Sequence, residues 1–119
     1  MANMSFALTV KQMQSGEKDV TRRMGWLRLK PQSVVNPVLK CMGLRLGEKI
    51  TPICGPISVV NTRREPLNRM ILEPEYGKAE CRREGFPDLT PAEFVDMYCK
   101  THRGCTPQTM VTRIEFTYL

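Results

Sequence analysis

The C-terminal residues alternate between two kinds of side chain with a period of two. Along residues 110–118, one set of alternate positions is mainly apolar or aromatic: Thr112, Ile114, Phe116 and Tyr118. The other set is polar: Arg113, Glu115 and Thr117. This alternation is typical of a β-strand. We therefore predict a C-terminal strand over about residues 110–118.

Two other segments are predicted to be helices, one from its apolar spacing and one from its start signals. Phe6, Val10 and Met13 recur at i, i+4 and i+7 before Gly16, which predicts a helix over about residues 6–15 capped by Ser5. The second helix is predicted over about residues 91–102 from its start signals. These are a capping Thr, a Pro at the first helical position and a Glu three residues after the cap, in the run Thr90-Pro91-Ala92-Glu93.

Shorter segments complete the pattern. Residues 18–23 lack an apolar helical stripe and are interpreted as a polar strand, and residues 34–42 as a strand interrupted by Pro37. The clearest strand within residues 50–64 covers 57–61, and residues 67–72 favour a short helix. Several strands without a βαβ rhythm predict an α+β fold: a small mixed β-barrel flanked by helices, as one domain over residues 1–119.

Composition narrows the class of partner and compartment. The 119 residues are 41% hydrophobic and 25% charged, as in a globular domain, and the net charge of +6 favours polyanionic partners such as RNA. Five scattered cysteines and no signal-like N-terminus lead us to expect reduced thiols and a cytoplasmic location. Apolar runs fall far short of the ~20 residues of a spanning helix, so no membrane association is expected.

The densest cluster of chemically useful side chains lies between Gly16 and Arg23. This run matches the pattern Gly-x-Lys-x-x-Thr-x-Arg and resembles the signature of the ASCH family, which is similar to PUA-like barrels associated with RNA. Three later segments resemble the same family in the same order, so the likeness covers most of the chain. They are Glu84-Gly85-Phe86, the segment from Thr90 to Tyr98, and Arg113-Ile114-Glu115-Phe116.

The resemblance to the small N(4)-acetylcytidine amidohydrolases of that family implies three catalytic residues. Thr21 would attack the acetyl carbonyl, Lys18 as a neutral amine would accept its proton, and Glu84 would pass a proton to the departing cytosine amine. Residues three apart on a strand face opposite sides, so Lys18 must precede the strand that holds Thr21. No cofactor is expected.

Four residues are candidates for substrate binding, three of them close to the motif: Arg22, Arg23, Trp26 and Phe86. Arg23 would hold the base carbonyl or a developing oxyanion, and an aromatic ring could stack on a base. Two features depart from the small amidohydrolases: extra length through residues 41–49, and Gln32-Ser33 in place of the Gly-Asp that the family has after Lys30-Pro31. The segments Gly25-Trp26 and Arg63-Arg64-Glu65-Pro66 resemble a separate ASCH branch of uncharacterised proteins.

Several alternatives stay open at this point. The same cleft could serve a module that binds RNA or a modified base without turnover, or a metal-independent ribonuclease. The charged run could also be a solvated surface with Glu84 as an ion-pair partner. Cys99, His102 and Cys105 could supply three zinc ligands. They are a weak candidate, because the sequence has no Cys-x-x-Cys knuckle to support a structural zinc site. A monomer or weak dimer is expected.

Overall fold

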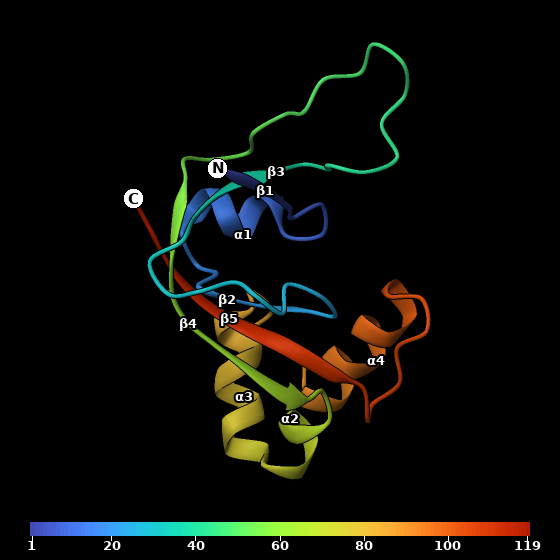
Figure 1. Cartoon of the computed structure of the whole chain (residues 1–119). Coiled ribbons are helices and arrows are strands. Elements are labelled where there is room, and N and C mark those ends of the chain that lie inside the picture. The colour runs from blue at the N-terminus through green and yellow to red at the C-terminus, as the bar shows by residue number, and fades with distance from the viewer.

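The computed structural model describes all residues, 1–119, as five strands and four short helices (Figure 1). In chain order these are β1 (Ala2–Ser5), α1 (Val10–Ser15), β2 (Val20–Arg23), β3 (Val34–Val38), β4 (Ile57–Pro66), α2 (Arg69–Leu72), α3 (Pro74–Arg83), α4 (Pro91–Thr101) and β5 (Met110–Tyr118). The strands form one sheet in the order β1-β3-β4-β5-β2. Only the β1–β3 pair is parallel. The α+β class is thus confirmed, with a mixed sheet that is open between its edge strands β1 and β2.

The long antiparallel pair of β4 and β5 divides the interior into two hydrophobic clusters. One joins β1, α1, β3, β4 and β5 and includes Met4, Met13 and Phe116. The other joins α2, α3, α4 and β5 and includes Met70, Phe94 and Val111. In Figure 1, α1 lies near β1 and β3 while α2, α3 and α4 gather at the other end. Both faces of β5 are therefore covered by other elements.

The C-terminal strand and the second predicted helix are found where the sequence pattern placed them. In α4 the Thr90 hydroxyl accepts a hydrogen bond from the Glu93 amide, and the Glu93 carboxylate accepts one from the Thr90 amide. This reciprocal capping box satisfies two amides that a helix start leaves free. Pro91 occupies the first turn, as predicted.

The predicted N-terminal helix over residues 6–15 is wrong in its first half. Residues 2–5 pair with β3 as a strand, and Ser5 Oγ donates to the Leu39 carbonyl instead of capping a helix. The helix begins only at Val10 and ends, as expected, at Gly16 with φ of 79°. Pairing with a distant strand outweighed the local i, i+4 spacing, because Met4 and Phe6 are both buried in the first cluster.

Other boundaries also differ from the prediction. The strand expected over residues 34–42 ends at Val38, and the strand expected over 57–61 extends to Pro66. Between them residues 39–56 form a long connection that projects from the body of the molecule (Figure 1), with Leu46 fully exposed. None of the four helices has the length and hydrophobicity needed to cross a lipid bilayer.

Helix α3 was not expected from the sequence, although it supplies much of the candidate site. Its buried residues are Gly77, Glu80 and Cys81, so the inner face is small or charged instead of apolar. Gly77 lies where α3 meets α2, and a Cβ added there would come within 1.8 Å of the Met70 carbonyl oxygen. Only glycine permits this approach of the two helices.

We predict that Gly77→Ala lowers the free energy of unfolding by roughly 2 kcal/mol, because the added methyl group meets backbone that cannot move aside. The clash is expected to outweigh the ~1 kcal/mol gain in helix propensity. Urea unfolding followed by circular dichroism measures the change. Gly55→Ala, where a Cβ meets nothing within 4 Å, serves as the control. Equal stability of the two variants would contradict the close packing of α2 on α3.

Candidate functional site

A cavity with a volume of about 180 Å³ lies beside the edge strand β2. Its walls come from four parts of the chain: the segment before α1, the end of the Gly16–Arg23 motif, the turn after α3, and one face of α4. The residues that line it include Phe6, Thr9, Lys18, Thr21, Arg22, Arg23, Glu84, Phe86, Tyr98 and His102. The structure therefore brings together segments up to about a hundred residues apart in sequence.

A buried ion pair forms part of the cavity wall. Lys18 Nζ donates to Glu84 Oε1 over 2.7 Å and to the Glu84 carbonyl oxygen over 2.9 Å. Both residues are nearly inaccessible to solvent. Burial lowers the pKa of Lys18, while the charge of Glu84 and its hydrogen bond act in the opposite direction. As required by the strand geometry, Lys18 lies before β2, which begins at Val20.

Arg22 holds the same carboxylate from the other side. Its guanidinium donates to Glu84 Oε2 over 2.9 Å, to Glu80 Oε1 over 2.6 Å and to Glu65 Oε2 over 3.3 Å. The side chain is completely buried, and its Nε is the one buried side-chain polar atom without a hydrogen-bond partner. Arg22 thus serves to position Glu84 and is not available to a ligand as a free cation.

Glu80 links this cluster to the centre of the sheet. Its carboxylate also pairs with Arg113, which stands opposite Arg22 in the β2–β5 register. Burial alone would raise the pKa of Glu80, but the hydrogen bond from Arg113 and the charge of Arg22 lower it to about 2. On the polar face of β5, α3 therefore buries Arg113 through paired charges, whereas Thr117 near the end of the strand stays exposed.

Thr21 and Arg23 lie on the opposite face of β2 from Arg22, because successive strand residues alternate. Arg23 Nε donates to Thr21 Oγ1 over 3.3 Å, and the guanidinium lies over the Phe6 ring at 4.6 Å from its centre. No ion pair involves Arg23, and burial lowers its pKa although the charge of Glu84 opposes this. The Thr21 hydroxyl makes no hydrogen bond with Lys18.

The α4 wall of the cavity is aromatic. Tyr98 and His102 stack face to face, with ring centres 3.8 Å apart and planes 7° from parallel. His102 Nδ1 lies 2.9 Å from the Tyr98 carbonyl oxygen and 3.0 Å from the Thr101 hydroxyl oxygen. The Tyr98 hydroxyl donates to the Arg22 carbonyl oxygen, which ties α4 to β2.

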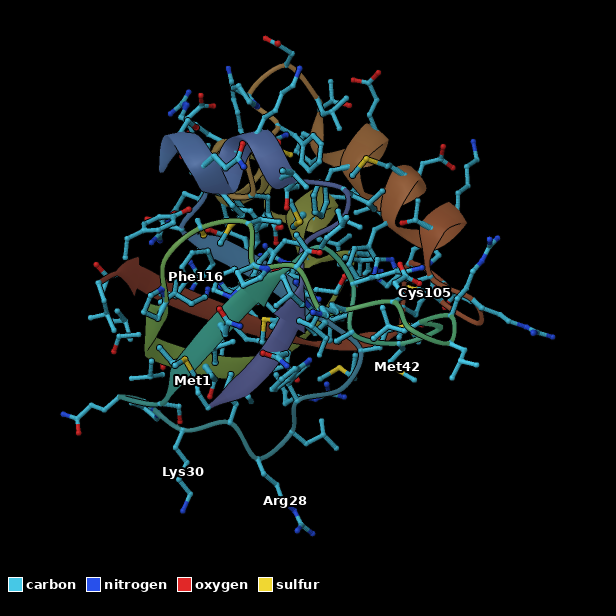
Figure 2. All side chains as sticks on the ribbon, turned by 90° about the horizontal axis from the view of Figure 1, so that it is seen from above. Met1, Arg28, Lys30, Met42, Cys105 and Phe116 are labelled. Carbon is cyan, nitrogen blue, oxygen red and sulfur yellow. The ribbon has the colours of Figure 1, made fainter.

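The other predicted site residues divide between the cavity and the rest of the molecule. Phe86 lines the cavity, whereas Trp26 lies outside it, packs partly buried against the first cluster and has a φ of 60°. In the same β2–β3 connection, Arg28 and Lys30 extend into solvent (Figure 2). Neither of these two basic side chains lines the cavity.

No protein-family model matches the chain, and no curated protein matches it in sequence. Its fold is similar to that of a solved structure described as the hypothetical protein PH0355, with a TM-score of 0.65 and 13% sequence identity over 99% of this chain and 96% of the other. The two proteins share a fold. At this identity the likeness says nothing about ligand or reaction.

The zinc candidate is not assembled as a metal centre. Cys99 and Cys105 approach each other with 3.8 Å between their sulfur atoms, while the His102 ring is turned to Tyr98. Nowhere do three His, Cys, Asp or Glu side chains gather in an arrangement suited to a metal ion. Burial raises the pKa of Cys99 to about 11, with a further rise from its contact with Cys105.

Several lining residues were not recognised as site residues from the sequence. Met97, Tyr98 and Thr101 lie in α4, a helix predicted from its start signals alone and with no part in the site. The signal that could have identified them is the position of this helix shortly after Glu84 in the sequence. Phe6 and Thr9 had no signal, because the segment before α1 was expected to be helical.

We predict that Glu80→Gln lowers the free energy of unfolding at pH 7 by ~3–5 kcal/mol, because it removes the carboxylate that Arg22 and Arg113 share in the buried network. The folded-state pKa of about 2 lies below the ordinary 4.5. The stability due to ionised Glu80 is therefore complete above about pH 4.5 and is lost as the pH falls toward 2. Chemical unfolding between pH 3 and pH 7 should give a flatter curve for Glu80→Gln than for the wild type.

The matched control is Glu75→Gln, an exposed position on the same helix. It is expected to change stability by less than about 0.5 kcal/mol. If both variants unfold alike at every pH, the buried network does not stabilise the fold.

Proposed function

We propose that this chain is an ASCH-type domain, related to the PUA-like barrels, that binds a modified nucleoside or RNA base and hydrolyses the acetyl amide of N(4)-acetylcytidine. The observation that carries this proposal is the buried Lys18–Glu84 pair in a cavity that Thr21 also lines. A shielded amine and carboxylate beside a hydroxyl are the groups that amide hydrolysis needs.

The size of the cavity favours a single heterocyclic base. A cavity of about 150 Å³ accommodates one benzene ring, and this one has about 180 Å³. Its walls combine aromatic rings with a few polar groups, as in small-molecule sites. A six-membered pyrimidine with a small acyl substituent matches this volume better than a folded polymer segment, so RNA would enter through one base turned out of its stack.

The ion pair can supply a base and an acid in the same step. Transfer of one proton from Lys18 Nζ to Glu84 Oε1 yields a neutral amine and a protonated carboxyl group. The amine accepts the Thr21 hydroxyl proton as Oγ1 bonds to the acetyl carbon, and the carboxyl group protonates the departing amine as the C–N bond breaks. Cytidine leaves, and the Lys18–Glu84 ion pair is restored. Water then attacks the Thr21 ester, which releases acetate and regenerates the hydroxyl group.

One observation favours a second function, base binding without turnover. The Thr21 hydroxyl accepts a hydrogen bond from Arg23 and has none with Lys18, so the nucleophile and its base are not in contact. Catalytic hydrogen bonds often form only when substrate is bound, which keeps hydrolysis as the leading proposal. The two functions differ in what Thr21 does. A nucleophile is needed for product, whereas a binding hydroxyl is needed only for affinity.

The test is incubation of the purified protein with N(4)-acetylcytidine, with cytidine measured by chromatography. Thr21→Val should reduce product to background, because it removes the hydroxyl group and keeps the shape, and Thr21→Ser should retain measurable product. Lys18→Met and Glu84→Gln should each lower kcat by more than about 100-fold. Thr117→Val, an exposed threonine on β5, is the control and should match the wild type.

Binding is measured on the same proteins by calorimetry. If the wild type binds N(4)-acetylcytidine and releases no cytidine, while Thr21→Val weakens binding, the second function replaces the first. If Thr21→Val still forms product at the wild-type rate, the assigned nucleophile is wrong.

A further inference from the structure

Arg23 is a cation in the cavity without a counter-charge. Its side chain is partly buried and makes no ion pair, and its one hydrogen bond uses Nε. The nearby carboxylate of Glu84 is already shared by Lys18 and Arg22. A guanidinium remains charged even where burial lowers its pKa. Holding it in a partly desolvated position costs free energy that a bound anion would offset.

The unused polar groups around Arg23 are mainly donors. Both terminal nitrogens of Arg23 have no partner in the protein, and the Lys18 ammonium donates only two of its three N–H groups. Thr9 also lines the cavity, and its hydroxyl makes no hydrogen bond. Such a set is complementary to a ligand that presents several acceptor oxygens, and the paired terminal nitrogens of arginine match a phosphate in particular.

The burial of the lining residues indicates how a ligand would be oriented in the cavity. Lys18, Thr21 and Glu84 are buried, whereas Arg23 is partly exposed. An acyl group that reacts at the buried residues would leave the sugar side of the nucleoside toward the opening. Arg23 Nε is already hydrogen-bonded to Thr21 Oγ1, so its two free terminal nitrogens are the groups that would meet a phosphate carried on the ribose. A neutral nucleoside would leave this cation unpaired.

From these observations we propose that the substrate carries a phosphate ester, so that the cavity takes a nucleotide in preference to a free nucleoside and Arg23 binds its phosphate. This inference rests on the proposed function for the base and acyl group. The inference gives Arg23 a role at the opening of the cavity, whereas the sequence motif predicted that Arg23 holds the base carbonyl or an oxyanion.

The experiment compares N(4)-acetylcytidine, its 5′-monophosphate and a trinucleotide with the acetylated base at its centre. In low salt the wild type should bind the monophosphate at least tenfold more tightly than the nucleoside. Arg23→Gln should abolish this preference and raise KM for the phosphorylated substrate more than KM for the nucleoside. A trinucleotide that binds as tightly as the monophosphate identifies an RNA phosphodiester as the natural group, and a weaker one identifies the monoester.

Arg28→Gln provides the matched control, because it removes the same charge from the following connection at a side chain that points into solvent (Figure 2). It should keep the full preference for the monophosphate. Equal affinity of the wild type for nucleoside and monophosphate overturns the inference. So does an Arg23→Gln variant that loses kcat alike on both substrates, since Arg23 then stabilises the reacting acyl group.

The hydrolysis proposal and the phosphate-site proposal can be refuted independently of each other. Tight, Arg23-dependent binding of the monophosphate with no acetate released refutes hydrolysis and retains the phosphate site. Acetate released equally from nucleoside and monophosphate by both the wild type and Arg23→Gln retains hydrolysis and refutes the phosphate site. Circular dichroism of Arg23→Gln shows that its fold is intact before either conclusion is drawn.

Discussion

The Glu84 carboxylate, held between Lys18 and Arg22, is the interaction on which the candidate site depends. It fastens the C-terminal end of α3 to the edge strand β2 through two buried cations. A buried carboxylate is tolerated only with such partners, and Glu84 is the one ion-pair partner of Lys18. The same ion pairs therefore form the site and hold α3 against the sheet. A substitution at Glu84 that disturbs the chemistry also disturbs the fold.

Strand β2 separates two kinds of polar residue. Arg22 faces α3 and forms ion pairs with Glu65, Glu80 and Glu84. On the other face Thr21 and Arg23 border the cavity, where Arg23 contacts the Phe6 ring and the Thr21 hydroxyl and makes no ion pair. Two adjacent arginines thus differ in environment because strand alternation directs them to different faces, only one of which α3 covers. The first is structural, and the second has spare hydrogen-bonding capacity.

The proposals follow from this division of roles. Amide hydrolysis uses the buried pair, in which an amine and a carboxylate can exchange a proton away from water. Recognition of a phosphate uses the donors that the protein leaves unsatisfied at the opening. The fold shared with the hypothetical protein PH0355 supplies the framework for both and implies neither.

Local sequence determined those elements whose signals are local. The capping box of α4, the period of β5 and the stop at Gly16 depend on neighbouring residues, and each appears as expected. The Gly16–Arg23 motif also marked Lys18, Thr21 and Arg23, all of which line the cavity.

Only the tertiary structure decided the rest. The strand over residues 2–5 exists because β3 pairs with it, and α3 lacks a simple apolar stripe because its inner face is divided between the buried charges at Glu80 and the second hydrophobic cluster at Cys81. Which arginine is buried and which is free depends on the strand's position at the sheet edge and on α3 covering one of its faces. These are contacts between distant segments, and a linear pattern of hydrophobic and polar residues does not encode them.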